Sequence, residues 1–181
     1  MNVPILILAW KRPNHVKKVI SSLRKIKPIN IYVSCDGADD INKLESSLVE
    51  ETREVIQKEI DWECKKNFNF SKKKLGCRFG VSKGISWFFQ NVNEGIIIED
   101  DCIIHPHFFH FAEVLLEKYK YDSRIGSISA SNLQNGIKRG SSSYYFSKYH
   151  HCWGWATWKD RWKNYDQELE SWMFIKTNKL K

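Results

Sequence analysis

The regular alternation of short apolar runs with stretches of helical periodicity constrains the fold most. The runs at 3–10, 29–37 and 95–100 are rich in Ile, Val and Leu and predict buried strands. A further strand is expected over 125–131, and one short strand within the polar stretch 62–70. Between these runs, apolar residues recur at helical spacing, which predicts helices from Pro13 to near Pro28, over 44–56, over 81–92 and from Pro106 to Leu116.

Strands that alternate with helices favour right-handed crossovers and an α/β fold. We therefore expect a Rossmann-like, mainly parallel central sheet with helices on both faces. No internal repeat or low-complexity linker interrupts the pattern, so one domain is expected over 1–181. In such sheets the ligand crevice lies outside the carboxyl ends of the strands. Polar residues at those ends are the first candidates for a functional site.

Charged residues follow three of the predicted strands. Arg12 follows the first, Asp36 ends the second, and Glu99, Asp100 and Asp101 end the strand "GIIIED". Buried carboxylates are costly unless something neutralises them, and adjacent carboxylates commonly hold Mg²⁺ or Mn²⁺. The pattern therefore predicts a divalent cation and a bound diphosphate at this edge. Structural alternatives stay open: Asp36-Gly37 as a turn, the acids as a cap for the helix at Pro106, and Arg12 as a helix-entry residue.

Other phosphate and metal motifs are missing. The turn "AWKRPN" has no glycine, so it cannot cradle a pyrophosphate with its backbone as dinucleotide folds do. Gly76, Gly80 and Gly84 are spaced by four and lack the P-loop pattern, which favours close helix packing. A zinc site is a weaker alternative, because the histidines and cysteine that cluster in the sequence lack ligand spacing; they are His105, His107, His110, His150, His151 and Cys152.

The net charge of +8 favours anionic partners, among them nucleotides, nucleic acids and an anionic membrane face. Alternatively, the lysines form a solvated surface that binds no specific ligand. A basic nucleic-acid-binding module also explains the charge, but it explains neither the acid triplet nor the lack of a nucleic-acid motif, so no nucleic acid partner is expected. Five cysteines without CxxC pairs indicate reduced thiols and a cytoplasmic protein, and the apolar run 3–10 is too short to span a membrane.

Four segments, "PILILAWKRP", "IYVSCDG", "GIIIEDD" and "GWATWKDRW", resemble GT-A glycosyltransferases in order and approximate spacing. The resemblance is greatest to bacterial relatives of N-acetylglucosaminyltransferase I, and it covers almost the whole chain. It implies a metal-dependent, inverting transfer of sugar from a nucleotide-diphosphate sugar, such as a UDP-sugar, to a saccharide or lipid-linked saccharide. The expected setting is the synthesis of surface polysaccharides.

The resemblance also implies roles for single residues. Asp101 would bind the cation, assisted by Asp100, and Glu99 and Asp100 would act through water or the sugar hydroxyls. Arg12 and Asp36 would contact the nucleotide, with Arg78 and Lys83 as further candidates in "RFGVSKG".

The segment "HCWGWATWKDRW" holds four tryptophans in twelve positions. The spacing of Trp155, Trp158 and Trp162 predicts a helix packed into the core, although flat indole faces also stack on sugars. By resemblance, Trp153 and Gly154 would lie in a loop and Trp155 would begin the helix, with all three bordering the acceptor.

An inverting transfer needs an acid side chain to deprotonate the acceptor hydroxyl. Asp166 is the candidate for this base, with Asp160 and Glu168 as alternatives. The resembling enzymes extend well beyond the position of Lys181, so a chain that binds donor without transferring sugar is a second hypothesis. A sugar-nucleotide pyrophosphorylase is the nearest competing enzyme, but its Gly-rich first loop is missing.

Overall fold

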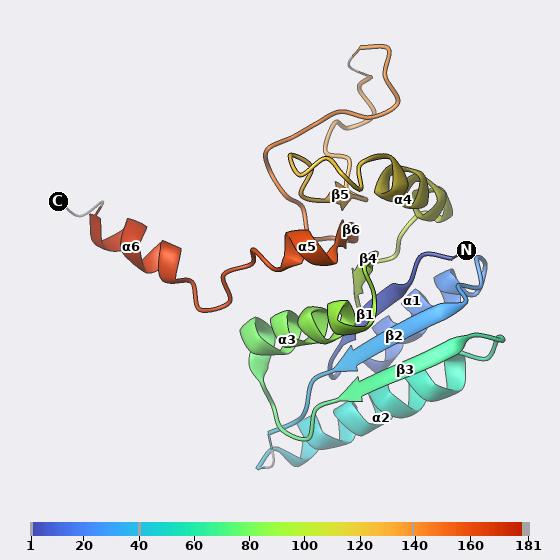
Figure 1. Cartoon of the computed structure of the whole chain (residues 1–181). Helices are drawn as coiled ribbons and strands as arrows, with labels where there is room; N and C mark the ends of the chain where they lie inside the picture. Colours follow the sequence, from blue (N-terminus) through green and yellow to red (C-terminus); the bar gives the residue numbers. More distant parts are fainter. Residues whose placement is uncertain (1, 40, 139, 179–181) are drawn as a thin grey trace.

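A six-stranded sheet organises the computed structural model, which describes residues 2–39, 41–138 and 140–178 (Figure 1). The strand order is β3-β2-β1-β4-β6-β5. The strands are β1 (Ile5–Ala9), β2 (Asn30–Cys35), β3 (Lys65–Phe70), β4 (Glu94–Glu99), β5 (Ile128–Ser129) and β6 (Trp155–Trp158). The predicted α/β fold with a mainly parallel sheet is confirmed.

The first four strands are parallel to one another. Ile5 of β1 pairs with Ile31 of β2 on one side and with Ile96 of β4 on the other, which makes β1 the centre of the parallel part. All five residues of β1 are buried, as expected for a strand covered on both faces. The chain builds β2 and β3 on one side of β1 and then crosses to the other side for β4, so the topological switch point lies between β1 and β4.

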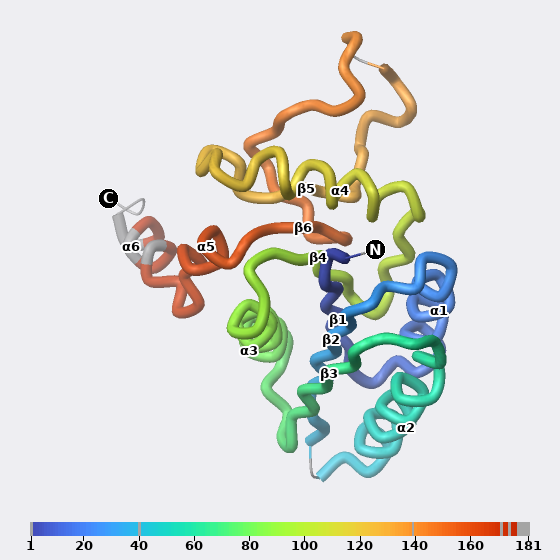
Figure 2. The backbone as a smooth tube through the Cα atoms, turned by 45° about the vertical axis from the view of Figure 1, so that its right-hand side comes forward, coloured from blue at the N-terminus to red at the C-terminus, as the bar shows by residue number. Residues whose placement is uncertain are grey.

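Helices cover both faces of the sheet (Figure 2). One face carries α1 (Pro13–Leu23), α2 (Lys43–Glu59) and α4 (Pro106–Lys118), whose apolar side chains share one core cluster with inward residues of β1, β2 and β4. The other face carries α3 (Gly76–Asn91), which packs Ile85, Phe88 and Phe89 on Leu6 and Ile97. The four predicted helices are confirmed, but α1 ends at Leu23 and not near Pro28, and α3 begins five residues earlier than predicted.

The close approach of α3 to the sheet explains its glycine spacing. A Cβ atom added at Gly84 would lie 2.8 Å from Ser34 Oγ and 2.9 Å from Leu8 Cδ2, and one at Gly80 would lie 3.1 Å from Asp36 Oδ2. Real Cβ atoms essentially never come within 3.0 Å of a neighbour, so Gly84 lets the helix backbone lie directly on β1 and β2. The expected packing role of these glycines is confirmed at Gly84.

The prediction that Trp155 begins a helix is wrong. Trp155–Trp158 form β6, which is antiparallel to β4, and only Lys159–Trp162 are helical, as α5. Alternate side chains of a strand point to opposite faces. Accordingly, Trp155 packs with the α3 cluster, whereas Trp158 packs with the cluster of α1, α2 and α4. Because both faces of β6 are covered, all four of its residues are buried, and this hides the period of two that would have indicated a strand.

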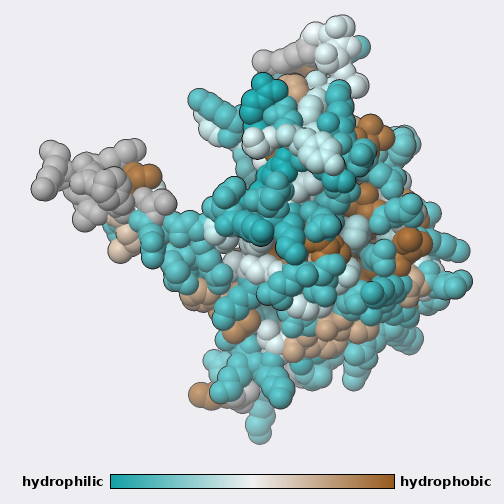
Figure 3. Space-filling model, viewed as in Figure 1, coloured by the Kyte–Doolittle hydropathy of each residue, from teal (hydrophilic) through white to brown (hydrophobic). Residues whose placement is uncertain are grey.

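The chain beyond β5 is less regular. The predicted strand over 125–131 shortens to Ile128–Ser129, and a long connection leads from there to β6. After α5, the helix α6 (Glu170–Asn178) extends away from the sheet (Figure 1). Trp172, Met173 and Ile175 of α6 are exposed, whereas most of the face of the body shown in Figure 3 is hydrophilic. In the described part of the chain, no helix is both long enough and apolar enough to span a membrane.

Candidate functional site

A cavity of about 330 Å³ lies at the carboxyl ends of β1, β2 and β4, against the first turns of α3. The charged and aromatic side chains on its walls are those of Trp10, Arg12, Asp36, Lys74, Glu99 and Asp100, and Ser34 and Cys77 line it as well. The sequence predicted that Arg12, Asp36 and the acids at the end of β4 would share one edge, and the structure brings them to that edge, where Glu99 and Asp100 line the cavity and Asp101 lies beside it, in contact with Arg12. The cavity also lies at the switch point between β1 and β4, where ligands bind in open α/β sheets.

Arg12 joins the two sides of the switch point. Its Nη1 atom donates to Asp100 Oδ1 at 3.2 Å and to Asp101 Oδ2 at 2.8 Å. Asp100 is buried, and its other oxygen accepts the backbone N–H of Trp10 at 3.1 Å. The side chain of Asp101 is 45% exposed and can therefore reach a ligand from solvent. Arg12, the N-cap residue of α1, and the acids at the end of β4 thus form one ionic unit across adjacent strands.

This unit carries more negative than positive charge. Glu99, Asp100 and Asp101 bring three carboxylates, and Arg12 supplies one guanidinium, so full ionisation leaves a net charge of about −2. Burial raises the pKa of Glu99, and the neighbouring charges of Asp101 and Asp100 raise it further. Burial also raises the pKa of Asp100, although the Trp10 N–H and Arg12 oppose that effect. Each raised pKa means that the ionised carboxylate is less favoured here than it is in water.

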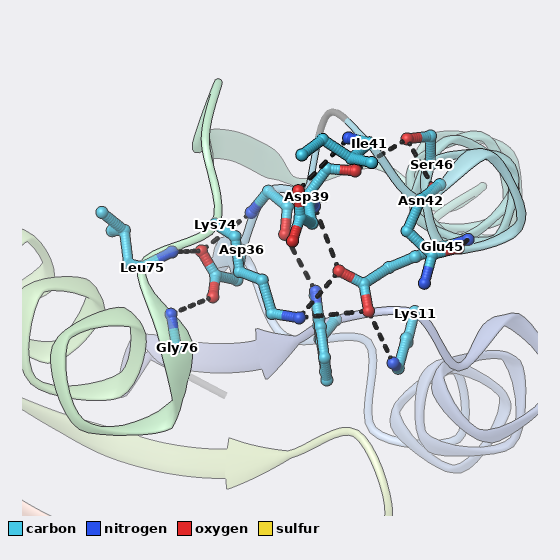
Figure 4. A network of polar contacts seen from close by, with 12 residues as sticks. Lys11, Asp36, Asp39, Ile41, Asn42, Glu45, Ser46, Lys74, Leu75 and Gly76 are labelled. Atoms are coloured by element: carbon cyan, nitrogen blue, oxygen red, sulfur yellow. Dashed lines mark hydrogen bonds and ion pairs between the residues drawn. The ribbon is translucent and has the colours of Figure 1, made fainter.

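Asp36 organises the start of α3 in addition to lining the cavity. Its Oδ1 accepts the backbone N–H groups of Gly37 at 2.8 Å and Leu75 at 2.9 Å, and its Oδ2 accepts that of Gly76 at 2.9 Å (Figure 4). Helices leave their first N–H groups without partners, and a carboxylate satisfies them well. The proposed contact with a nucleotide stays a prediction, and it would have to share a carboxylate that already accepts three hydrogen bonds.

A second charged group, which was not predicted from the sequence, centres on Glu45. Lys11 Nζ donates to Glu45 Oε2 at 2.7 Å, and Lys74 Nζ lies 2.9 Å from Oε1 and 3.2 Å from Oε2 of the same carboxylate (Figure 4). Both ammonium groups also lie over the ring of Trp10, at 4.0 Å for Lys11 and 4.7 Å for Lys74. Hydrogen bonds from these lysines lower the pKa of Glu45 to about 2, so its carboxylate is ionised at neutral pH.

A local signal for this group existed in the sequence. Asn42 caps α2 by accepting the N–H of Glu45, and an acid three residues after a cap is typical of a helix start. Here the carboxylate does not return to the cap residue; it accepts the N–H of Asp39 and the two lysines instead. The lysines come from the ends of β1 and β3, so only the folded topology reveals their convergence.

Arg78 and Lys83, the other predicted nucleotide contacts, are not on the cavity wall. Arg78 donates from Nε and Nη2 to the carbonyl oxygen of Gln167 at 3.1 and 2.7 Å and pairs with Glu168 at 3.3 Å. Lys83 lies over the ring of Phe79. Arg78 therefore fastens the segment after α5 to α3, while the small residues Cys77, Gly80 and Val81 line the cavity.

The tryptophan segment divides into exposed and buried parts. Trp153 is 57% exposed and stacks on His151. Gly154 has φ = +77°, and a Cβ atom there would lie 2.2 Å from Ile104 Cδ1. Trp155 is buried and packs against Trp162. Of the three predicted acceptor contacts, Trp153 is thus the one that presents an open aromatic face.

The acids considered as catalytic base do not line this cavity in the described part of the chain. Asp160 pairs with Arg161, and Glu168 pairs with Arg78. Asp166 lies between α5 and α6, where its carbonyl oxygen accepts the N–H of Leu169. The role of Asp166 as the base stays a prediction.

No metal cluster of three or more His, Cys, Asp or Glu residues occurs within 2–39, 41–138 and 140–178. His105 instead caps α4, accepting the N–H of His107, and His150 lies 2.9 Å from Ser127 Oγ. The zinc alternative gains no support from this arrangement. A cation at Asp100 and Asp101 would need further ligands from its substrate.

Comparisons with known proteins leave the family open. No family model matches the sequence, and a search of curated proteins finds no match. Among solved structures, HddC from Yersinia pseudotuberculosis is similar to this chain with a TM-score of 0.43 and 14% identity. The match covers 64% of this chain and 55% of HddC, so the chain spans about half the length of that protein. A likeness this distant carries no argument about function, and the Rossmann-like assignment rests on the observed sheet topology.

Proposed function

We propose that this protein binds a nucleotide-diphosphate sugar with Mn²⁺ or Mg²⁺ and transfers the sugar to a saccharide acceptor with inversion. The observation that supports this most is the contact of Arg12 with Asp100 and Asp101 across the switch point of the sheet. The contact brings two carboxylates and a guanidinium together at the edge where α/β sheets take nucleotides, which supports roles for them in binding a metal ion and a phosphate.

The residues present fit a divalent cation. Mg²⁺ and Mn²⁺ prefer oxygen ligands, and Mg²⁺ often uses only one or two protein carboxylates together with phosphates of the substrate. Asp101 is exposed enough to serve as such a ligand, and Asp100 lies beside it. The excess negative charge of the acids and the raised pKa values of Glu99 and Asp100 also favour an added cation. Bound there, the ion would stabilise the negative charge of the leaving nucleoside diphosphate.

The other residues have separable tasks in this proposal. Arg12 holds Asp100 and Asp101 in position and remains half exposed, so it can also contact a phosphate. Trp153 offers its indole face to the acceptor, because aromatic faces pack on the C–H surfaces of sugars. Asp166 would accept the proton of the attacking hydroxyl.

A donor-binding protein without transferase activity is the second candidate. It is favoured by one observation, namely that Asp160, Asp166 and Glu168 are not on the wall of the donor cavity. The two candidates share the nucleotide site and differ only in turnover, so one experiment can address both.

The experiment measures binding first and product second. Melting curves with UDP-sugars should show a rise in melting temperature that requires both nucleotide and Mn²⁺, since a ligand stabilises the state that it binds. Acceptor-dependent release of nucleoside diphosphate would then support glycosyl transfer, and release of pyrophosphate would support a pyrophosphorylase instead. Stabilisation without any turnover would support the donor-binding protein. Salt-sensitive binding of random oligonucleotides without a nucleotide effect would contradict the proposal.

A further inference from the structure

The cavity has an acidic end and a basic end. At the acidic end, Arg12 pairs with both Asp100 and Asp101, so the carboxylates outnumber its one guanidinium. At the basic end, Lys11 and Lys74 share the single carboxylate of Glu45, which leaves a net charge of about +1. The excess carboxylates of the acidic end favour a cation, and the surplus positive charge of the basic end favours an anionic ligand.

Only one of the two lysines faces the cavity. Lys74 is on its wall, whereas Lys11 contacts the same carboxylate and the same indole but is not on the wall. Among the described residues, Arg12 and Lys74 are the cationic side chains that line this cavity. Lys74 lines the cavity, whereas Arg78 and Lys83, which the sequence suggested, contact other residues.

Lys74 is also held in a defined position. Glu45 fixes its ammonium group from one side, and the ring of Trp10 lies 4.7 Å from Nζ. Trp10 is itself fixed, because its indole N–H donates to the carbonyl oxygen of Gly37 at 2.9 Å. An ammonium group held in advance loses less side-chain entropy when it binds a ligand than a free surface lysine does.

We propose that Lys74 is a phosphate-binding residue for the nucleoside diphosphate of this cavity, and that Glu45 and Trp10 are its positioning residues. This inference rests on the proposed function, because it assumes that a nucleotide occupies the cavity. It adds a site residue that lies 38 positions beyond Asp36 in the sequence and that no motif indicated.

The test compares three variants by calorimetry. The probe is whichever of UDP, GDP, dTDP, CDP and ADP binds the wild-type protein most tightly in Mn²⁺, together with the nucleoside of the same base. Lys74→Met should weaken diphosphate binding about tenfold or more, as expected for the loss of a charge-assisted hydrogen bond. The matched control is Lys72→Met, which removes the same charge from an exposed side chain two residues away that is not on the cavity wall.

Glu45→Gln tests the positioning role. It should weaken diphosphate binding less than Lys74→Met does, while the affinity for the nucleoside stays at the wild-type value. A purely structural role of Glu45 would instead lower both affinities together. Melting curves without ligand establish that each variant is folded.

The outcomes separate this inference from the proposed function. If the wild-type protein binds none of the five diphosphates, the proposed function fails. If the wild type binds one of them and Lys74→Met binds it as tightly as Lys72→Met does, the inference is wrong while the proposed function stands. A loss that is equal for diphosphate and nucleoside would also overturn the role of Lys74 in phosphate binding.

Discussion

The parallel half of the molecule and the region that follows β5 differ in how their structure is determined. In the parallel half, the carboxyl ends of β1, β2 and β4 form walls of the cavity, and the helices pack their apolar faces on buried strands. After β5, a long connection, a four-residue strand, a short helix and the extended α6 follow one another. The cavity proposed to bind the donor therefore depends on strand order, whereas the region expected to bind the acceptor depends on loops and single contacts.

The largest loss of stability is expected for a substitution in the core of the parallel half. Phe88 is fully buried, with its ring 5.1 Å from those of Tyr32 and Phe89, so Phe88→Ala should cost about 3–5 kcal/mol of unfolding free energy. Trp172→Ala in α6 removes a larger side chain that is 58% exposed, and its cost should be within about 0.5 kcal/mol. Urea denaturation measures both. Similar losses for the two variants would contradict the distinction between the regions.

An intermediate effect is expected at Gly154. Gly154→Ala introduces a Cβ atom at positive φ and against Ile104, so it should destabilise the protein by about 1–3 kcal/mol. Gly126→Ala is the matched control, because a Cβ atom there meets no other atom within 4 Å and φ is not positive. Thermal denaturation of the two variants would show whether the loop before β6 is as tightly determined as the sheet. Equal stabilities of the two variants would mean that the loop before β6 is less tightly determined than the sheet.

The smallest effect concerns pH. Glu45 has its pKa lowered to about 2 from an ordinary value of 4.5, so its contribution to stability is fully present above pH 4.5 and is lost as the pH falls toward 2. Glu45→Gln should therefore be less stable than the wild type at pH 7, and the difference should shrink between pH 4.5 and 2. Urea midpoints across this range measure it. A difference that stays constant with pH would show that the carboxylate charge is not involved.

Much of the parallel half could be predicted from local pattern. The continuous apolar run of β1 is typical of a strand that is buried on both faces. The proline at the start of α1 is typical of a first helical position, and the acids at the end of β4 stand out because buried carboxylates are costly. Strand alternation then predicted that Arg12 and Asp100, which are 88 residues apart, lie at the same edge of the sheet, and the structure shows them in contact.

The remainder depends on contacts that no local pattern encodes. Trp155 and Trp158 have helical spacing, yet pairing with β4 makes them a strand. Lys11 and Lys74 meet at Glu45 only because the end of β1, the start of α2 and the segment after β3 lie at one place. Arg78 resembles a ligand contact in sequence, but the carbonyl oxygen of Gln167 binds it in the fold.

The most direct test of the account is the affinity for a UDP-sugar, measured by calorimetry with and without Mn²⁺, for the wild type and for Asp101→Asn. Glu117→Gln, which removes an exposed carboxylate away from the cavity wall, is the control. The account predicts that wild-type binding requires Mn²⁺ and that Asp101→Asn loses this metal-dependent affinity about tenfold to hundredfold, as for loss of a ligand carboxylate or its support. Wild-type affinity in Asp101→Asn, with the same dependence on Mn²⁺, would contradict it.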